Sequence, residues 1–153
     1  MELRKLSLAD IESVKNLVFA AFSEPPWNDD WSDSAQFHQY IVDLTQNANS
    51  LTLGLYSADA NERDACLVAV SMGRIIHWFE GTEYFIDDLC VRPDLQGQGI
   101  GSLFMSKIED YLRRIDVKAI VLRSEREIPA YFFYRKLGFV ENAKSVFFTK
   151  TLF

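Results

Sequence analysis

Three glycines within five residues form the segment of this chain best suited to chemistry. They stand in residues 96–101 (QGQGIG), between an apolar run that ends at Val91 and an amphipathic stretch that begins at Ile100. Glycine lacks the Cβ atom that would keep a phosphate away from the main chain, and a helix that begins after such a turn points its unpaired N–H groups at a bound anion. The segment therefore predicts a phosphate-binding loop.

The spacing of this loop disfavours two common nucleotide motifs. A P-loop requires Gly-Lys-Ser/Thr at its end, and the first lysine after this loop is Lys107. The dinucleotide fingerprint G-x-G-x-x-G requires a glycine where this chain has Ser102, and the acidic Asp116 precedes the next strand instead of closing it. Nucleoside triphosphates and dinucleotides are thus disfavoured as ligands.

Two further segments accompany the loop in a fixed order. Residues 87–93 (DDLCVRP) precede it and residues 129–139 (PAYFFYRKLGF) follow it. Together the three segments resemble the GNAT superfamily of acyl-CoA-dependent N-acetyltransferases, and residues 85–102 are similar to the corresponding stretch of spermidine/spermine acetyltransferases. The resemblance implies a GNAT-like fold over nearly the full length, acetyl-CoA as cofactor with CoA as product, and direct transfer of an acetyl group to a primary amine in a ternary complex.

The resemblance assigns cofactor binding to two neighbouring stretches. In the family, the strand before the loop parts from its neighbour, so that its backbone groups bind the pantetheine arm and hold the thioester carbonyl. The loop and the start of the helix hold the pyrophosphate. Glu127 departs from the family pattern, because many relatives carry a cofactor-contacting asparagine there. The cofactor-binding residues expected here are Leu89, Cys90, Val91, Gln96, Gly97, Gln98, Gly99, Ile100, Gly101 and Ser102.

Amine acetylation requires a route for the ammonium proton and an acid for the departing thiolate. The pKa of a lysine-type amine is ~10.4, so a carboxylate or a water chain must remove a proton at neutral pH. Asp87 and Asp88 are the candidates, and because neighbouring strand residues point to opposite faces, we expect only one of them to face the cleft. The resemblance assigns the acid to Tyr134, four residues before Gly138.

A loop rich in aromatic and acidic side chains lies between the two N-terminal helical segments. Aromatic faces beside carboxylates suit ammonium groups, which favours a small cationic amine as acceptor. A solvated acidic loop anchored by two packing tryptophans is nearly as good an interpretation. The candidate acceptor-binding residues are Trp27, Asp29, Asp30, Trp31 and the strand residue Glu83.

Two other functions remain open at this point. One is acetylation of a peptide or protein amine, either an N-terminus or a lysine. The other is a non-catalytic acyl-CoA-binding module that keeps the loop and has lost turnover, which the retention of Tyr134 and the acidic pair disfavours. Acceptor profiling separates the first alternative, and thiol release separates the second.

Composition sets the expected surroundings of the chain. The 153 residues suit one domain spanning residues 1–153, and the net charge of -6 without basic clusters disfavours nucleic acid and anionic membranes as partners. Cys66 and Cys90 lie inside apolar runs, which favours a reduced, cytoplasmic setting. We expect a small-molecule amine as partner, allow for a homodimer, and expect no metal, because His38 and His77 lack ligand spacing.

Hydrophobic periodicity predicts the elements that must position these residues, in the order βααβββαβαβ. This order is an α/β fold with a mixed, mostly antiparallel central sheet flanked by about four helices. Gly73 interrupts the third strand, which predicts a bulge or bend there, and Gly138 suits the left-handed position after the last helix. Strands are expected at residues 2–6, 51–56, 66–79, 84–91, 118–123 and within 139–153, and helices after Ser7, at 33–47, from Ile100 and from Pro129.

Overall fold

The computed structural model describes residues 1–57 and 65–153. These residues form two compact units, residues 1–123 and residues 124–153. The first unit holds all the described strands and three of the α-helices, and the second holds the last helix and the C-terminal segment. That residues 1–153 act as one domain stays a prediction.

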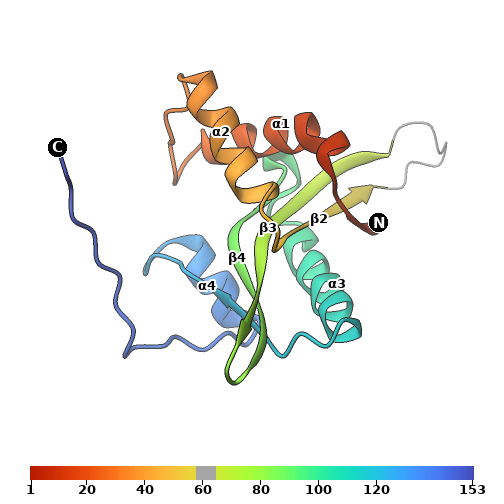
Figure 1. Cartoon of the computed structure of the whole chain (residues 1–153). Coiled ribbons are helices and arrows are strands. Elements are labelled where there is room, and N and C mark those ends of the chain that lie inside the picture. The colour runs from red at the N-terminus through yellow and green to blue at the C-terminus, as the bar shows by residue number, and fades with distance from the viewer. Residues whose placement is uncertain (58–64) are drawn as a thin grey trace. The chain divides into compact units, whose positions relative to one another are not determined.

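Five strands form a single sheet in the first unit, in the order β1-β2-β3-β4-β5 (Figure 1). The first four strands pair antiparallel, and β5 pairs parallel with β4. The predicted mixed, mostly antiparallel sheet is therefore confirmed. The strands are β1 (Glu2–Lys5), β2 (Ser50–Ser57), β3 (Cys66–Trp78), β4 (Gly81–Val91) and β5 (Ala119–Leu122).

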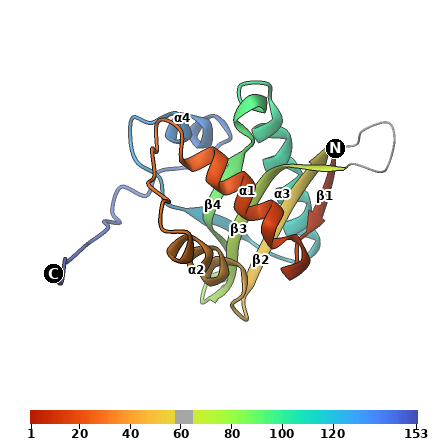
Figure 2. The same cartoon turned by 90° about the horizontal axis from the view of Figure 1, so that it is seen from above.

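Three α-helices cover the two faces of this sheet. In Figure 2, α1 and α2 lie on one face, and α3 lies on the other. Among the described helices, none is both long and apolar enough to cross a membrane. The helices are α1 (Ile11–Phe22), α2 (Ser34–Thr45), α3 (Ile100–Arg114) and, in the second unit, α4 (Pro129–Lys136), with short 3-10 turns η1 (Leu8–Asp10) and η2 (Pro93–Leu95).

Local capping explains where the first two helices begin. The Ser7 hydroxyl accepts from the Ala9 N–H and the Asp10 carboxylate accepts from the Ser7 N–H, which forms a capping box on the turn η1 that leads into α1. The Asp33 carboxylate accepts from the Ala35 and Gln36 N–H groups and starts α2. The apolar stripes of both helices then pack on Val70 and Met72 of β3 to form the core of this face.

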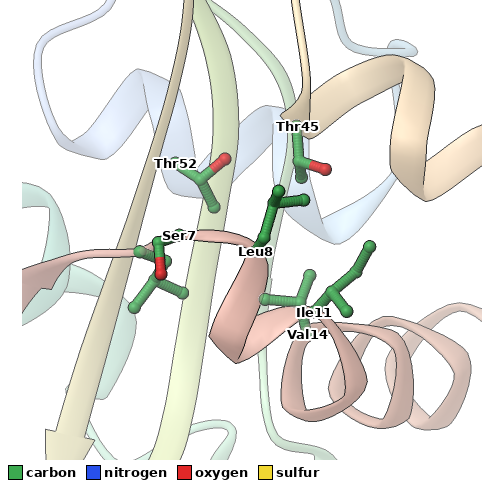
Figure 3. A pocket seen from close by; sticks show the side chains of 7 residues that line it. Ser7, Leu8, Ile11, Val14, Thr45 and Thr52 are labelled. Atoms are coloured by element: carbon green, nitrogen blue, oxygen red, sulfur yellow. The ribbon is translucent and has the colours of Figure 1, made fainter.

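A small cavity of about 20 Å³ lies where η1 and α1 meet the end of α2 and strand β2 (Figure 3). Such a volume suits one water molecule, and the buried Thr52 hydroxyl beside it has no hydrogen-bond partner among the described residues. None of the residues singled out for chemistry lines this cavity. Its lining consists of Leu6, Ser7, Leu8, Ile11, Val14, Thr45 and Thr52.

The prediction of a final strand within residues 139–153 is wrong. These residues follow α4 without forming a strand, and Val146, Phe148 and Leu152 are exposed. A strand requires a neighbouring strand to pair its backbone groups, and the second unit contains none among its described residues. Gly138, by contrast, has a φ of 91°, which confirms its predicted left-handed conformation after α4.

Candidate functional site

A β-bulge in β4 decides how the acidic pair is oriented. Met72 of β3 pairs with Asp88 and Gly73 pairs with Ile86, so Asp87 is an extra residue without a partner on β3. An extra residue shifts the alternation of side chains by one position. A Cβ atom on Gly73 would lie 2.5 Å from the Phe85 carbonyl oxygen, which explains why glycine stands at the predicted bulge.

Both aspartates lie on the sheet face that α1 and α2 cover. Asp88 accepts a hydrogen bond from the Tyr40 hydroxyl of α2. Asp87 binds Arg74, which shares its face with Met72 because it lies two residues further along β3, and Met72 belongs to the core under α1 and α2. The expectation that the two carboxylates point to opposite faces is therefore wrong, because the bulge cancels the alternation between them.

Asp87 is held in an ion pair with two parallel hydrogen bonds. The Arg74 Nε and Nη2 atoms each donate to one Asp87 carboxylate oxygen at 2.9 Å. The guanidinium also lies over the Phe85 ring, 4.9 Å from its centroid. Such a paired arrangement is among the stronger side-chain interactions and neutralises the carboxylate locally. Both carboxylate oxygens of Asp87 thus accept hydrogen bonds from Arg74.

Asp88 has the properties of a general base. Burial raises the pKa of Asp88 to about 6, and the nearby charges of Asp87 and Asp29 act in the same direction, while the hydrogen bond from Tyr40 opposes them. At neutral pH such a carboxylate is mostly ionised and is more basic than an ordinary aspartate. It can therefore accept a proton near the working pH.

The aromatic residues of the loop between α1 and α2 pack against one another and against α2. Trp31 stacks on Tyr40 at 5.0 Å and 27°, and it also contacts Phe37 at 5.0 Å. Trp27 contacts Phe22 at 5.6 Å. Both tryptophans therefore have the packing role that the sequence allowed, and contact with an acceptor stays a prediction for each of them.

The acidic candidates of this region have different surroundings. The Asp30 carboxylate accepts from the Ser32 N–H at 3.0 Å and so shapes the loop. Asp29 contributes to the raised pKa of Asp88, which shows that its charge acts on the same site. Glu83 lies on β4 opposite Ile76 of β3 and beside β5. Among the loop carboxylates, Asp29 is therefore the one whose charge raises the pKa of Asp88.

Strand β4 parts from β5 halfway along its length. Residues 83–86 pair with residues 119–122, and the ladder ends there. Residues 87–91 continue β4 beyond the end of this ladder. The pairing between β4 and β5 thus ends at Ile86 and Leu122, and the cofactor-binding role that the family resemblance implies for residues 89–91 stays a prediction.

The free side of β4 presents alternate backbone groups. The Arg92 N–H donates to the Val68 carbonyl at 2.8 Å, so Arg92 and, two residues earlier, Cys90 direct their backbone groups toward β3. The backbone groups of Leu89 and Val91 consequently point to the opposite edge of β4, beyond the end of its pairing with β5. An extended chain such as pantetheine can add to a strand edge of this kind. Cys90 itself is buried in the core under α1 and α2, as expected for a strand residue.

The glycines of the loop adopt the conformation that only glycine takes easily. Gly97 has a φ of 73° and Gly99 a φ of 82°, and a Cβ atom on either would meet no described atom within 4 Å. Gly99 precedes α3 without a side-chain cap, and the first turn of α3 carries no acidic residue. The N–H groups of Ile100, Gly101 and Ser102 at this helix end are thus available to an anion.

Two glutamines hold the loop in shape. The Gln96 side-chain amide donates to the Val91 carbonyl at 3.0 Å, and the Gln98 amide donates to the Asp94 carbonyl at 3.0 Å. Gln96 ties the loop to the end of β4, so the strand edge and the helix end keep a fixed relation. Gln96 therefore shapes the turn, and its contact with the cofactor stays a prediction.

Tyr134 and Glu127 belong to the second unit. Tyr134 lies on α4, where its ring packs edge-on against Phe133 and Phe139 at 5.2 and 5.3 Å. Glu127 precedes α4 with a φ of 69°. The roles of both residues stay predictions that rest on the sequence motif.

Sequence reasoning missed Tyr40 and Arg74 as parts of the site. Tyr40 falls within the helix expected at residues 33–47, among apolar residues at helical spacing, and Arg74 falls within the strand expected at residues 66–79. A signal existed for each, because a phenol in an apolar stripe needs a hydrogen-bond partner and a charge inside an apolar strand needs a counter-charge. The sequence does not tell which of the 22 acidic residues is the partner.

The chain belongs to the acetyltransferase (GNAT) family, which it matches over residues 11–139. A curated relative, the uncharacterized N-acetyltransferase ycf52 of Porphyra purpurea, is 31% identical over 86 residues, which are 56% of this chain and 47% of the relative. The chain thus spans about half the length of the curated relatives it matches.

Solved structures with the same fold cover nearly the whole chain. The aminoglycoside acetyltransferase AAC(6')-Iy, in complex with a bisubstrate analogue of CoA and acetylneamine, has a TM-score of 0.71 at 13% identity and covers 98% of this chain and 97% of its own. A ribosomal-protein-alanine N-acetyltransferase of Brucella melitensis has a TM-score of 0.72 at 16% identity, covering 99% and 100%. At these identities the likeness shows the fold.

Proposed function

We propose that this protein transfers the acetyl group of acetyl-CoA to a primary amine, most suitably a small cationic amine. The observation that carries the proposal is the continuity of one surface in the first unit: the strand edge at Leu89 and Val91 leads, through the Gln96 hydrogen bond, to the open end of α3. Asp88 lies on the same strand as this edge. Acetyl-CoA supplies the activated acetyl group.

The residues present fit CoA in two respects. The space beside Gly97 and Gly99 is open, and the uncapped α3 end offers N–H groups and a positive dipole to the pyrophosphate. The β4 backbone at Leu89 and Val91 binds the pantetheine arm and presents an N–H to the thioester carbonyl. Cys90, whose thiol is buried and whose pKa is raised by burial, takes no part as a nucleophile.

Asp88 manages the proton of the acceptor amine. Its carboxylate receives the proton directly or through one water molecule, and its raised pKa of about 6 makes this transfer easier than for an ordinary aspartate. Asp87 is excluded from this role in the proposal, because Arg74 occupies both of its carboxylate oxygens. The two members of the acidic pair therefore have different tasks.

Tyr134 donates a proton to the departing CoA thiolate. The support for this role is its position four residues before Gly138 in the family motif. A phenol with an ordinary pKa of ~10 is protonated at neutral pH and is close enough to a thiol, at ~8.5, to share its proton. Its removal should affect turnover and leave CoA binding intact.

The acceptor class is supported by charge. The charge of Asp29 raises the pKa of Asp88, and the chain as a whole carries a net charge of -6. An ammonium group is favoured in such a field.

The proposal also places the protein in the cytoplasm as a reduced enzyme. The support for this location is that Cys66 and Cys90 are free thiols. A homodimer stays a prediction.

The decisive experiment measures CoA thiol release over a panel of acceptors. Free polyamines and aminoglycosides are compared with peptides that offer an N-terminal amine or a lysine, because both kinds of acceptor occur among proteins of this fold. We expect release with the small cationic amines. Release with peptides alone would assign the protein-acetylating function, and thermal stabilisation by CoA without any release would assign a binding module.

A further inference from the structure

Tyr40 links the loop between α1 and α2 to the carboxylate that handles the amine proton. Its hydroxyl donates to Oδ2 of Asp88, 48 residues away in the sequence, and its ring stacks on Trp31. Tyr40 lies outside the three segments that resemble the family. We propose that Tyr40 is a positioning residue, which fixes the Asp88 carboxylate and keeps it ionised for catalysis, and that Trp31 holds the phenol in place.

The two oxygens of the Asp88 carboxylate differ in their hydrogen bonding. Tyr40 occupies Oδ2, and Oδ1 accepts no hydrogen bond from the residues that the structure describes. With Oδ2 fixed, the carboxylate cannot rotate freely, and Oδ1 keeps one direction. A positioned base is more effective than a mobile one, because the proton is then transferred along a prepared hydrogen bond.

Tyr40 serves as a permanent donor. Burial, together with the adjacent Asp88 charge, raises the pKa of Tyr40, so the phenol keeps its proton over the whole working range. A donor of this kind stabilises the ionised form of its carboxylate partner. It therefore limits the rise in the Asp88 pKa that burial alone would cause.

The charges around Asp88 come from several elements. On its own strand lies Asp87, which is paired with Arg74 of β3. The loop before α2 contributes Asp29, and α2 contributes the Tyr40 hydroxyl. The two carboxylates disfavour the ionised form of Asp88, and the hydroxyl is the group that favours it.

The test compares the pH dependence of Tyr40→Phe with that of the wild type. We expect the acidic midpoint of kcat/KM for the amine, near the Asp88 pKa of about 6 in the wild type, to rise by about one to two pH units in the variant. The variant is then about 5- to 50-fold slower at pH 6 and within about threefold of the wild type at pH 8.5. A merely structural role would lower activity equally at all pH values.

The matched control is Tyr56→Phe, which also removes a phenol from a carboxylate, that of Asp10, outside the site. It should leave the midpoint unchanged. Trp31→Leu keeps the hydroxyl and removes its stacking partner, so a smaller shift in the same direction is expected even if Tyr40→Phe unfolds. An unchanged midpoint in both Tyr40→Phe and Trp31→Leu would overturn the proposal.

The inference rests on the proposed function, and a second measurement separates the two. Titration of ¹³C-labelled aspartate by NMR reports the Asp88 midpoint directly in the wild type and in Tyr40→Phe, without any amine or CoA. A shift without thiol release from any acceptor would overturn the proposed function and leave the Tyr40–Asp88 relation standing. Thiol release with no shift in the Asp88 midpoint would overturn the inference alone.

Discussion

Arg74 donates a hydrogen bond to each carboxylate oxygen of Asp87, with two nitrogen–oxygen distances of 2.9 Å. This ion pair gives Asp87 different surroundings from Asp88, although the bulge brings both side chains to the same face of the sheet. Asp87 is paired with Arg74, and Asp88 remains the carboxylate with a raised pKa. The consequences of this division can be measured.

Replacement of the two aspartates should give unlike results. Asp88→Asn removes the proposed base, so kcat/KM for the amine should fall by roughly 10²–10⁴-fold while CoA affinity persists. Asp87→Asn removes the partner of Arg74, so it should cost about 1–2 kcal/mol of stability and change kcat/KM only a few-fold. Amine kinetics and denaturant unfolding of both variants are the measurements. Equal, small kinetic effects would contradict the assignment of Asp88.

Stability should depend on pH through Asp88. Its pKa is raised to about 6 in the folded protein, so the group favours folding below its ordinary pKa near 4, and this contribution is lost as the pH rises through 6. Relative to the wild type, Asp88→Asn should therefore gain up to about 3 kcal/mol between pH 4 and pH 7. Urea unfolding at both pH values checks this, and a difference independent of pH would argue against a raised pKa.

The loop glycines should be indispensable for CoA binding. Gly99→Val places a branched side chain in the open space before α3 and strains a residue whose φ is 82°. Loss of two or more charge-assisted hydrogen bonds predicts CoA binding weaker by at least about 100-fold in calorimetry. Gly138→Val is the control for strain, because Gly138 has a similar φ of 91° and a Cβ atom there would also meet no described atom within 4 Å. Unchanged CoA affinity in folded Gly99→Val would refute the loop assignment.

Tyr134→Phe should lower kcat by roughly 10²–10⁴-fold with little change in acetyl-CoA affinity, because it removes a proton donor and almost no volume. Tyr131→Phe is a matched control on the same helix, where the hydroxyl donates to Glu141 at 2.9 Å. Steady-state kinetics and calorimetry are compared for the two variants. Near-normal turnover of Tyr134→Phe would return this residue to a packing role with Phe133 and Phe139.

Features that depend on a few adjacent residues could be predicted from the sequence. The glycine loop before α3 and the left-handed Gly138 are set by the backbone preferences of short segments, and the glycine at position 73 also indicated a bulge there. Hydrophobic periodicity also predicted the order of the elements as far as α4. The strand predicted within residues 139–153 is wrong, because a strand forms only where another strand pairs with it, and a sequence pattern does not show whether such a partner is present.

The division of labour in the acidic pair was decided by tertiary structure alone. Alternation along an isolated strand predicts opposite faces for Asp87 and Asp88, and the register between β3 and β4 cancels it at the bulge. Their partners, Arg74 and Tyr40, come from another strand and from a helix 48 residues away from Asp88. A sequence specifies which residues carry charge, but burial and the approach of distant side chains decide which carboxylate pairs with an arginine and which has a raised pKa.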